Sequence, residues 1–178
     1  PVPPQKKGGK SDIEADLKLP AEIGIGIAST RIPNLTITLD YAYTMWERLD
    51  EVKVEMKDPD EVLGTTESVL VFDWENTHRI SIGGEYDLGA TRLRAGAFYD
   101  QSPIPESTQI PTISDISDKI SLNLGWGQNL GIIDLEANLQ WVIFSEREIT
   151  DADQTANNMT GKYNTNSLSG NIGLSWKF

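Results

Sequence analysis

The chain has 178 residues, of which 38% are hydrophobic, and its formal net charge is −12. This charge argues against nucleic-acid binding, because neutralising phosphates requires clustered Lys and Arg. Cysteine is absent, which excludes disulfides and thiolate metal sites, and no run of about 18 or more apolar residues is present that could form a transmembrane helix.

Residues 1–10 are mostly Pro, Gly and Lys without periodicity, and we expect a flexible linker or loop there. From residue 11 onward, apolar and polar residues alternate in eight successive segments. This alternation predicts antiparallel β-strands with one apolar face, and therefore an all-β, up-and-down fold. In chain order the predicted strands cover residues 12–19, 22–28, 35–45, 79–88, 92–99, 119–127, 133–144 and 171–178.

The connections between these segments alternate in length. The tight ones lie around residues 31–34, 89–90 and 129–131, and the long, polar ones at about 50–77, 103–118 and 150–166. A transmembrane β-barrel has short turns at its periplasmic rim and long loops outside, whereas a soluble sandwich has no reason to sort its loops in this way. The tight link at Pro20–Ala21 is the exception.

The polar side of the alternation is unusually rich in small residues, namely Gly24, Gly26, Ala28, Gly83, Gly96, Gly125 and Gly173. A face in contact with bulk water usually carries larger polar side chains, so we expect another group to pack closely here, as in a barrel lumen. Tyr and Trp also gather near strand ends, as they do at membrane interfaces. Both features favour a transmembrane β-barrel, although aromatic residues that cap an ordinary core remain an alternative.

Three stretches are specific enough to compare with a known family. They are Leu17-Lys18-Leu19-Pro20, the segment Asp40–Trp46 (DYAYTMW), and Tyr99-Asp100-Gln101-Ser102-Pro103-Ile104-Pro105. In order and spacing they resemble the C-terminal half of the FadL/TodX family of outer-membrane transporters, in which an aromatic residue followed by Asp and a Ser-Pro-x-Pro stretch enters an outer loop. The resemblance extends over residues 11–178. It implies the C-terminal part of a barrel of about 14 strands, of which about eight are present here.

The resemblance also implies a function, a location and partners. The function is passive transport of long-chain fatty acids or other hydrophobic molecules across a Gram-negative outer membrane. The implied partners are a hydrophobic small molecule or fatty acid, outer-membrane lipid, the barrel assembly machinery, and an N-terminal hatch with further strands upstream of Pro1. Lipopolysaccharide is a further candidate partner, bridged through divalent cations to the acidic stretch Glu47–Glu61, and the alternative for this stretch is a solvated outer loop. The residues themselves contain no nucleophile–base pair or phosphate-binding Gly loop, so we predict no enzymatic activity, cofactor or metal site.

Arg79, Arg92 and Arg94 fall on the polar side of their strands. In a lumen they are candidates to contact an anionic ligand head or a carboxylate of the hatch. The alternative is that they form only structural ion pairs with acidic residues on neighbouring strands. The family-like loop residues Tyr99, Asp100, Ser102, Pro103 and Pro105 are further candidates, on the strength of the resemblance.

Two further groups of candidates are apolar. Val69, Val71 and Phe72 lie in the most apolar stretch of a long connection, and they form either a ligand-collecting patch or the return arm of a hairpin with Val52 and Val54. Trp176 and Phe178 resemble the C-terminal aromatic signature that assembly machinery recognises on barrel proteins. This ending indicates an authentic C-terminus and places the cut end before Pro1.

Two other folds remain open. A complete eight-stranded barrel with a structural or adhesive role would pair the strand at 11–19 with the strand at 167–178. A soluble lipocalin-like binder of hydrophobic ligands would turn the apolar side of every strand inward.

Overall fold

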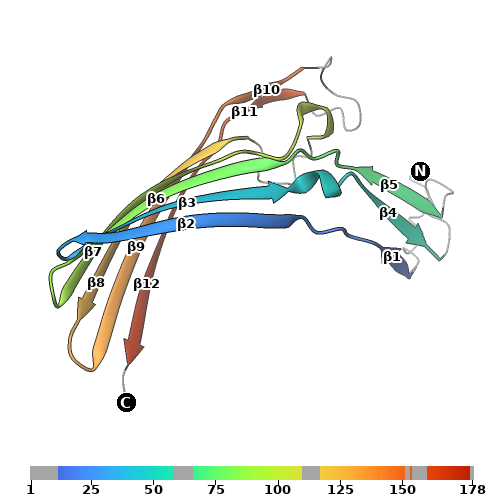
Figure 1. Cartoon of the computed structure of the whole chain (residues 1–178). Coiled ribbons are helices and arrows are strands. Elements are labelled where there is room, and N and C mark those ends of the chain that lie inside the picture. Colours follow the sequence, from blue (N-terminus) through green and yellow to red (C-terminus); the bar gives the residue numbers. More distant parts are fainter. Residues whose placement is uncertain (1–11, 58–65, 110–116, 151–152, 154–159, 177–178) are drawn as a thin grey trace, which may run out of the picture.

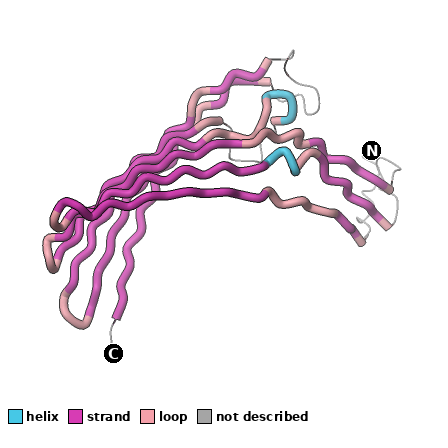
Figure 2. The backbone as a smooth tube through the Cα atoms, in the orientation of Figure 1, coloured by secondary structure: helices cyan, strands magenta, loops and turns pink. Residues whose placement is uncertain are grey.

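The computed structural model describes residues 12–57, 66–109, 117–150, 153 and 160–176, and these form β-structure almost throughout (Figures 1 and 2). Seven long strands make one antiparallel sheet in the order β12-β9-β8-β7-β6-β3-β2. They are β2 (Ala21–Ile32), β3 (Leu35–Met45), β6 (Thr77–Asp87), β7 (Thr91–Asp100), β8 (Lys119–Asn129), β9 (Ile133–Phe144) and β12 (Asn166–Trp176). The predicted all-β, antiparallel fold is confirmed.

The two ends of this sheet differ, as the lengths of the connections predict. At one end, the short-turn end, three tight turns join β2 to β3, β6 to β7 and β8 to β9. Asn34, Gly89 and Gly131 in these turns have φ values of 64°, 87° and 89°, a left-handed conformation that Gly and Asn adopt most readily. All the long connections lie at the opposite, long-loop end (Figure 1).

Shorter elements extend the fold beyond the long-loop end. One three-stranded sheet has the order β1-β4-β5, and one hairpin pairs β10 with β11. Within the described residues the only helical elements are two short 3₁₀ turns, and no helix there is long and apolar enough to cross a membrane. These elements are β1 (Ile13–Ala15), η1 (Trp46–Arg48), β4 (Glu51–Met56), β5 (Glu67–Val71), η2 (Glu106–Thr108), β10 (Arg147–Ile149) and β11 (Gly161–Tyr163).

The first predicted strand differs from expectation. Only Ile13–Ala15 of the segment 12–19 is a strand, and it pairs with β4 instead of joining the large sheet. Alternation determines which face a residue occupies but carries no information on the partner strand. Since β1 is not the neighbour of β2, Pro20–Ala21 is not a turn between adjacent long strands, and the exception in the connection lengths disappears.

The large sheet is open. Among the described residues, β2 pairs only with β3 and β12 pairs only with β9. The pairing of 11–19 with 167–178 that a closed eight-stranded barrel requires is not present, because β1 lies against β4. The described residues therefore form an open sheet and not a closed eight-stranded barrel.

Hydrophobic side chains are distributed in an unusual way. The buried ones, Leu49, Val52, Ile104 and Ile149, all lie at the long-loop end and none lies in the large sheet. The apolar sides of the seven long strands together form what we call the apolar face, and most of its large hydrophobic side chains are exposed, up to 85% for Ile172. An exposed apolar surface of this extent marks contact with lipid or another apolar partner.

Candidate functional site

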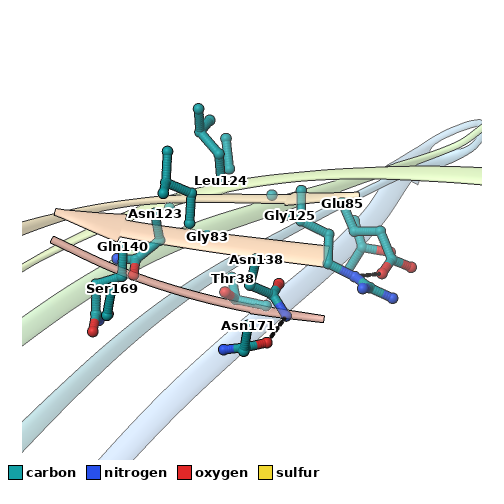
Figure 3. A pocket seen from close by; sticks show the side chains of 16 residues that line it. Thr38, Gly83, Glu85, Asn123, Leu124, Gly125, Asn138, Gln140, Ser169 and Asn171 are labelled. Atoms are coloured by element: carbon teal, nitrogen blue, oxygen red, sulfur yellow. Dashed lines mark hydrogen bonds and ion pairs between the residues drawn. The ribbon is translucent and has the colours of Figure 1, made fainter. Parts of the chain in front are cut away.

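The opposite side of the large sheet, which we call the polar face, carries a hollow of about 470 Å³ near its centre (Figure 3). Two rows of paired residues cross the sheet and supply its polar lining. One row consists of Asn171, Asn138, Gly125, Arg94, Glu85 and Thr36, and the next of Ser169, Gln140, Asn123, Gly96, Gly83 and Thr38. Figure 3 shows Leu124 directed to the other side of the sheet, as strand alternation requires.

Glycines form the floor of this hollow. A Cβ atom at Gly83 would lie 2.9 Å from Thr38 Oγ1, and one at Gly96 would lie 3.1 Å from the Ile82 carbonyl oxygen. At Gly125 it would lie 2.9 Å from Asn138 Oδ1 and 3.1 Å from Arg94 Cβ. Neighbouring side chains thus use the space that Gly83 and Gly125 leave, and a backbone carbonyl approaches Gly96, which explains the small residues at these three positions.

Arg92 and Arg94 form an ion-pair network across three strands. The Nε of Arg94 donates to Glu85 Oε2 at 2.5 Å on β6, and its Nη2 lies 3.4 Å from Glu136 Oε1 on β9. Arg92 Nη2 lies 3.4 Å from the same Glu136 oxygen. The two arginines reach β9 across Gly125 and Gly127 of β8, where no side chain intervenes. Of the two predicted roles for these arginines, the geometry favours structural pairing.

Arg79 differs from the other two arginines. Its guanidinium carbon lies 4.3 Å from the centre of the Phe98 ring, an attractive cation–π arrangement. It borders a second hollow of about 320 Å³, together with Glu22, Asp40 and Ser81. No carboxylate of the described residues lies within ion-pair distance of Arg79. Its charge is therefore available to a group that enters the hollow.

The family-like stretch at Tyr99–Pro105 begins at the end of β7 and organises the long-loop end. The Tyr99 hydroxyl donates to Asp118, whose second oxygen accepts from the Ser102 amide at 2.9 Å. Asp100 lies 3.3 Å from Lys119 Nζ on β8. The Pro103 carbonyl accepts from the amide of Glu75, and Pro105 precedes η2. This stretch thus closes the second long connection on itself through Asp118 and joins it to the first long connection through Glu75.

Behind this stretch lies a packed layer that the sequence does not reveal. Arg147 Nε lies 3.1 Å from Glu106 Oε1, and Arg147 Nη1 donates to Gln109 Oε1 at 3.1 Å. Gln109 is fully buried, and Ile104 and Ile149 are 1% and 2% exposed. We call the segments 101–109 and 145–149 the loop cap. Nothing in the sequence distinguishes Gln109 from the polar loop residues around it.

The apolar loop candidates lie away from the polar hollows. Val69 and Val71 are in β5, the return arm of a hairpin with β4, in which Val52 pairs with Leu70. Of the two alternatives, the structure shows the hairpin arm, and Val69 and Val71 remain 43% and 42% exposed on it. Phe72 follows β5 and packs edge-on against Trp74 at 5.5 Å.

Aromatic residues border both ends of the apolar face. Tyr41, Tyr43 and His78 cluster at the long-loop end, where the Tyr41 hydroxyl lies 2.7 Å from His78 Nδ1. Trp126 and Trp176 lie near the short-turn end, where Trp176 pairs with Ile133 and is 64% exposed. Phe178 and residues 1–10 lie outside the described residues.

Comparison with known proteins agrees with this geometry. A family model described as outer membrane protein transport protein (OMPP1/FadL/TodX) matches residues 5–178. The crystal structure of a Pseudomonas aeruginosa FadL homologue is similar in fold, with a TM-score of 0.69 at 20% sequence identity. The alignment covers 91% of this chain and 36% of that one, so the chain spans about a third of its length. No match is found among curated protein sequences.

Proposed function

Because the chain belongs to the OMPP1/FadL/TodX family of outer-membrane proteins, we propose that it forms part of the wall of a channel that passes hydrophobic molecules, such as long-chain fatty acids, passively across the outer membrane. The long strands of 10 to 12 residues are of the length that crosses a bilayer, with the apolar face toward lipid. The polar face then lines the lumen, and the short-turn end is periplasmic.

The observation that carries the proposal is the division of the large sheet into an exposed apolar face and a hollowed polar face. Val69, Val71 and Phe72, on the extension beyond the membrane, offer apolar surface for first contact with the solute. Burial of apolar surface contributes about 25 cal/mol per Å², which is sufficient to hold an alkyl chain without covalent chemistry. The proposal assigns transport and no catalytic step to the chain.

Uptake into vesicles tests this proposal. The full-length protein is placed in vesicles whose outer leaflet contains lipopolysaccharide, which slows the entry of hydrophobic compounds, and the entry of a fluorescent long-chain fatty acid is followed. We expect faster entry than in protein-free vesicles and a plateau at which the inner and outer free concentrations are equal. An unchanged rate would contradict transport, and a higher concentration inside would contradict the passive mode.

Arg79 is our candidate for the contact with a ligand's acidic head, since Arg92 and Arg94 are engaged by Glu85 and Glu136. A hydrogen bond to a charged group contributes about 1.5–3 kcal/mol, and less in a hydrated lumen. We expect Arg79→Gln to weaken binding of a long-chain carboxylate about fivefold. The alcohol of the same chain length should bind unchanged, because it has no negative charge.

Arg92→Gln is the matched control for this measurement, since the same change is made at an arginine on the polar face that already has a carboxylate partner. It should leave the affinity for both ligands unchanged. An equal loss for carboxylate and alcohol in Arg79→Gln would indicate a structural effect and exclude the assignment.

Further partners belong to the same proposal. The exposed Trp176, with Phe178, is proposed as the signal for the barrel assembly machinery. Lipopolysaccharide would meet the acidic connections at the long-loop end, and a hatch and further strands would lie against the polar face and the free edges of β2 and β12.

A further inference from the structure

The apolar face has a hollow of its own, of about 710 Å³, over β6, β7, β8 and β9. We propose that it is a binding site for an acyl chain of a phospholipid in the inner leaflet of the outer membrane. The inference uses the position of the sheet in the membrane and is independent of which solute the lumen carries.

Two rows of paired residues shape this hollow. Gly84 and Ala95 lie opposite each other and form its floor, and Leu124 and Leu139 continue the same row. The next row toward the short-turn end contains the large side chains of Tyr86, Leu93 and Trp126, which form a wall. The volume is within the range of about 300–1,000 Å³ that is usual for small-molecule sites.

The packing and backbone of the chain do not require a residue without a side chain at position 84, in the floor of this hollow. A Cβ atom at Gly84 would meet only the Thr36 carbonyl oxygen, at 3.8 Å, which is ordinary van der Waals contact. Gly84 also has no left-handed φ value that would favour glycine. The adjacent Gly83, on the polar face, differs because its Cβ would lie 2.9 Å from Thr38 Oγ1. The space above Gly84 is therefore open to a group from the membrane.

The lining identifies the chemistry of the occupant. The side chains on the apolar face of the hollow are uncharged, and the guanidinium of Arg94 is held on the opposite face by Glu85 and Glu136. The next row beyond the wall, toward the short-turn end and on the same face, contains Thr91 and Gln128. There the Thr91 hydroxyl donates to Gln128 Oε1 at 2.6 Å. An apolar chain thus fits the hollow, with a neutral polar pair below it at the depth of the ester and head groups.

The leaflet follows from orientation. The hollow lies beside the aromatic residues of the short-turn end, which is periplasmic in an outer-membrane barrel, so the inner leaflet surrounds it. We therefore commit to a phospholipid as the source of the chain, and a solute released from the lumen is the competing source that the experiment must separate.

Photo-crosslinking tests the site in the full-length protein. The protein is reconstituted with phosphatidylethanolamine that carries a photoreactive diazirine in its acyl chain, and labelled peptides are identified by mass spectrometry. We expect labelling on β6–β8 that falls at least fivefold in Ala95→Phe, which fills the hollow, and in Gly84→Leu, which fills it from the floor. The matched control is Ala97→Phe, on the same strand and face but outside the lining, and it should retain full labelling.

Three results would overturn the proposal. The first is equal labelling in Ala95→Phe and Ala97→Phe. The second is labelling that both Ala95→Phe and Gly84→Leu retain in protein with the heat-resistant mobility of a folded barrel. The third is displacement of the label by hexadecane but not by unlabelled phosphatidylethanolamine, which would assign the hollow to a transported solute.

Discussion

Replacing Ile104 with alanine should destabilise the loop cap by about 2–5 kcal/mol, the cost usual for truncating a fully buried aliphatic side chain. Ile104 is 1% exposed and lies between Pro103 and Pro105, in the stretch that joins the second long connection to the first. Because the large sheet buries no hydrophobic side chain among its described residues, the few buried ones in the loop cap carry a large share of the packing energy.

Protease protection measures this effect. Folded full-length protein should be cleaved in residues 101–109 at least tenfold faster after Ile104→Ala than before the change. Ile104→Val, which removes one methylene group, should cost about 0.5–1.5 kcal/mol and accelerate cleavage much less. Leu124→Ala, on the exposed apolar face, should leave the rate unchanged. Equal cleavage rates for the alanine and valine variants at Ile104 would show that the loop cap does not depend on this side chain.

Replacing Glu136 with lysine should lower the stability of the large sheet by about 2–3 kcal/mol. The change removes the carboxylate that both Arg92 and Arg94 approach at 3.4 Å and places a third positive charge beside them. Each half-exposed ion pair contributes up to about 1 kcal/mol, and like charges that face each other cost a similar amount. The loss is the sum of two lost attractions and two new repulsions.

The temperature at which the folded full-length barrel loses its compact mobility on a gel measures this loss. Glu22→Lys makes the same charge change on the polar face, away from both arginines, and should lower that temperature less. Adding Arg92→Glu to Glu136→Lys should restore part of the stability, since opposite charges again face each other. A double variant no more stable than Glu136→Lys alone would mean that the network contributes through side-chain size and not through charge.

Much of the fold follows from the sequence, because the alternation within a strand by itself determines which face of the sheet each residue occupies. The alternation over residues 133–144 determines β9 and its two faces, and the Gly and Asn residues of the tight turns determine which strands are neighbours. The partner of β1 could not be predicted in this way. Its three residues alternate as regularly as those of β9, but pairing with β4 depends on a free strand edge that only the folded connection supplies.

The candidate site was predictable to a similar degree. The alternation along the strands places Arg79, Arg92 and Arg94 on one face of the sheet. Only the register across β8 shows that Glu136 reaches Arg92 and Arg94 but not Arg79. The contacts of Gln109 and Arg147 were not predictable, because they join connections that are distant in sequence and have no periodicity. The hollow over Gly84 and Ala95 could not be predicted, because the sequence places small residues on both faces of the strands and does not show which of them lie open.

The separation of the buried side chains from the tight turns has a consequence for the order of events during biogenesis. Hairpins such as β6–β7 and β8–β9 have all their pairing partners close in sequence and can form early, while the chain is still on the periplasmic side. Ile104, Gln109 and Ile149 are buried where the long connections meet, so they can pack only after these connections, which are distant in sequence, have come together. We therefore expect the loop cap to close after the hairpins of the large sheet have formed, so that a protein arrested during insertion would have paired long strands and an unpacked loop cap.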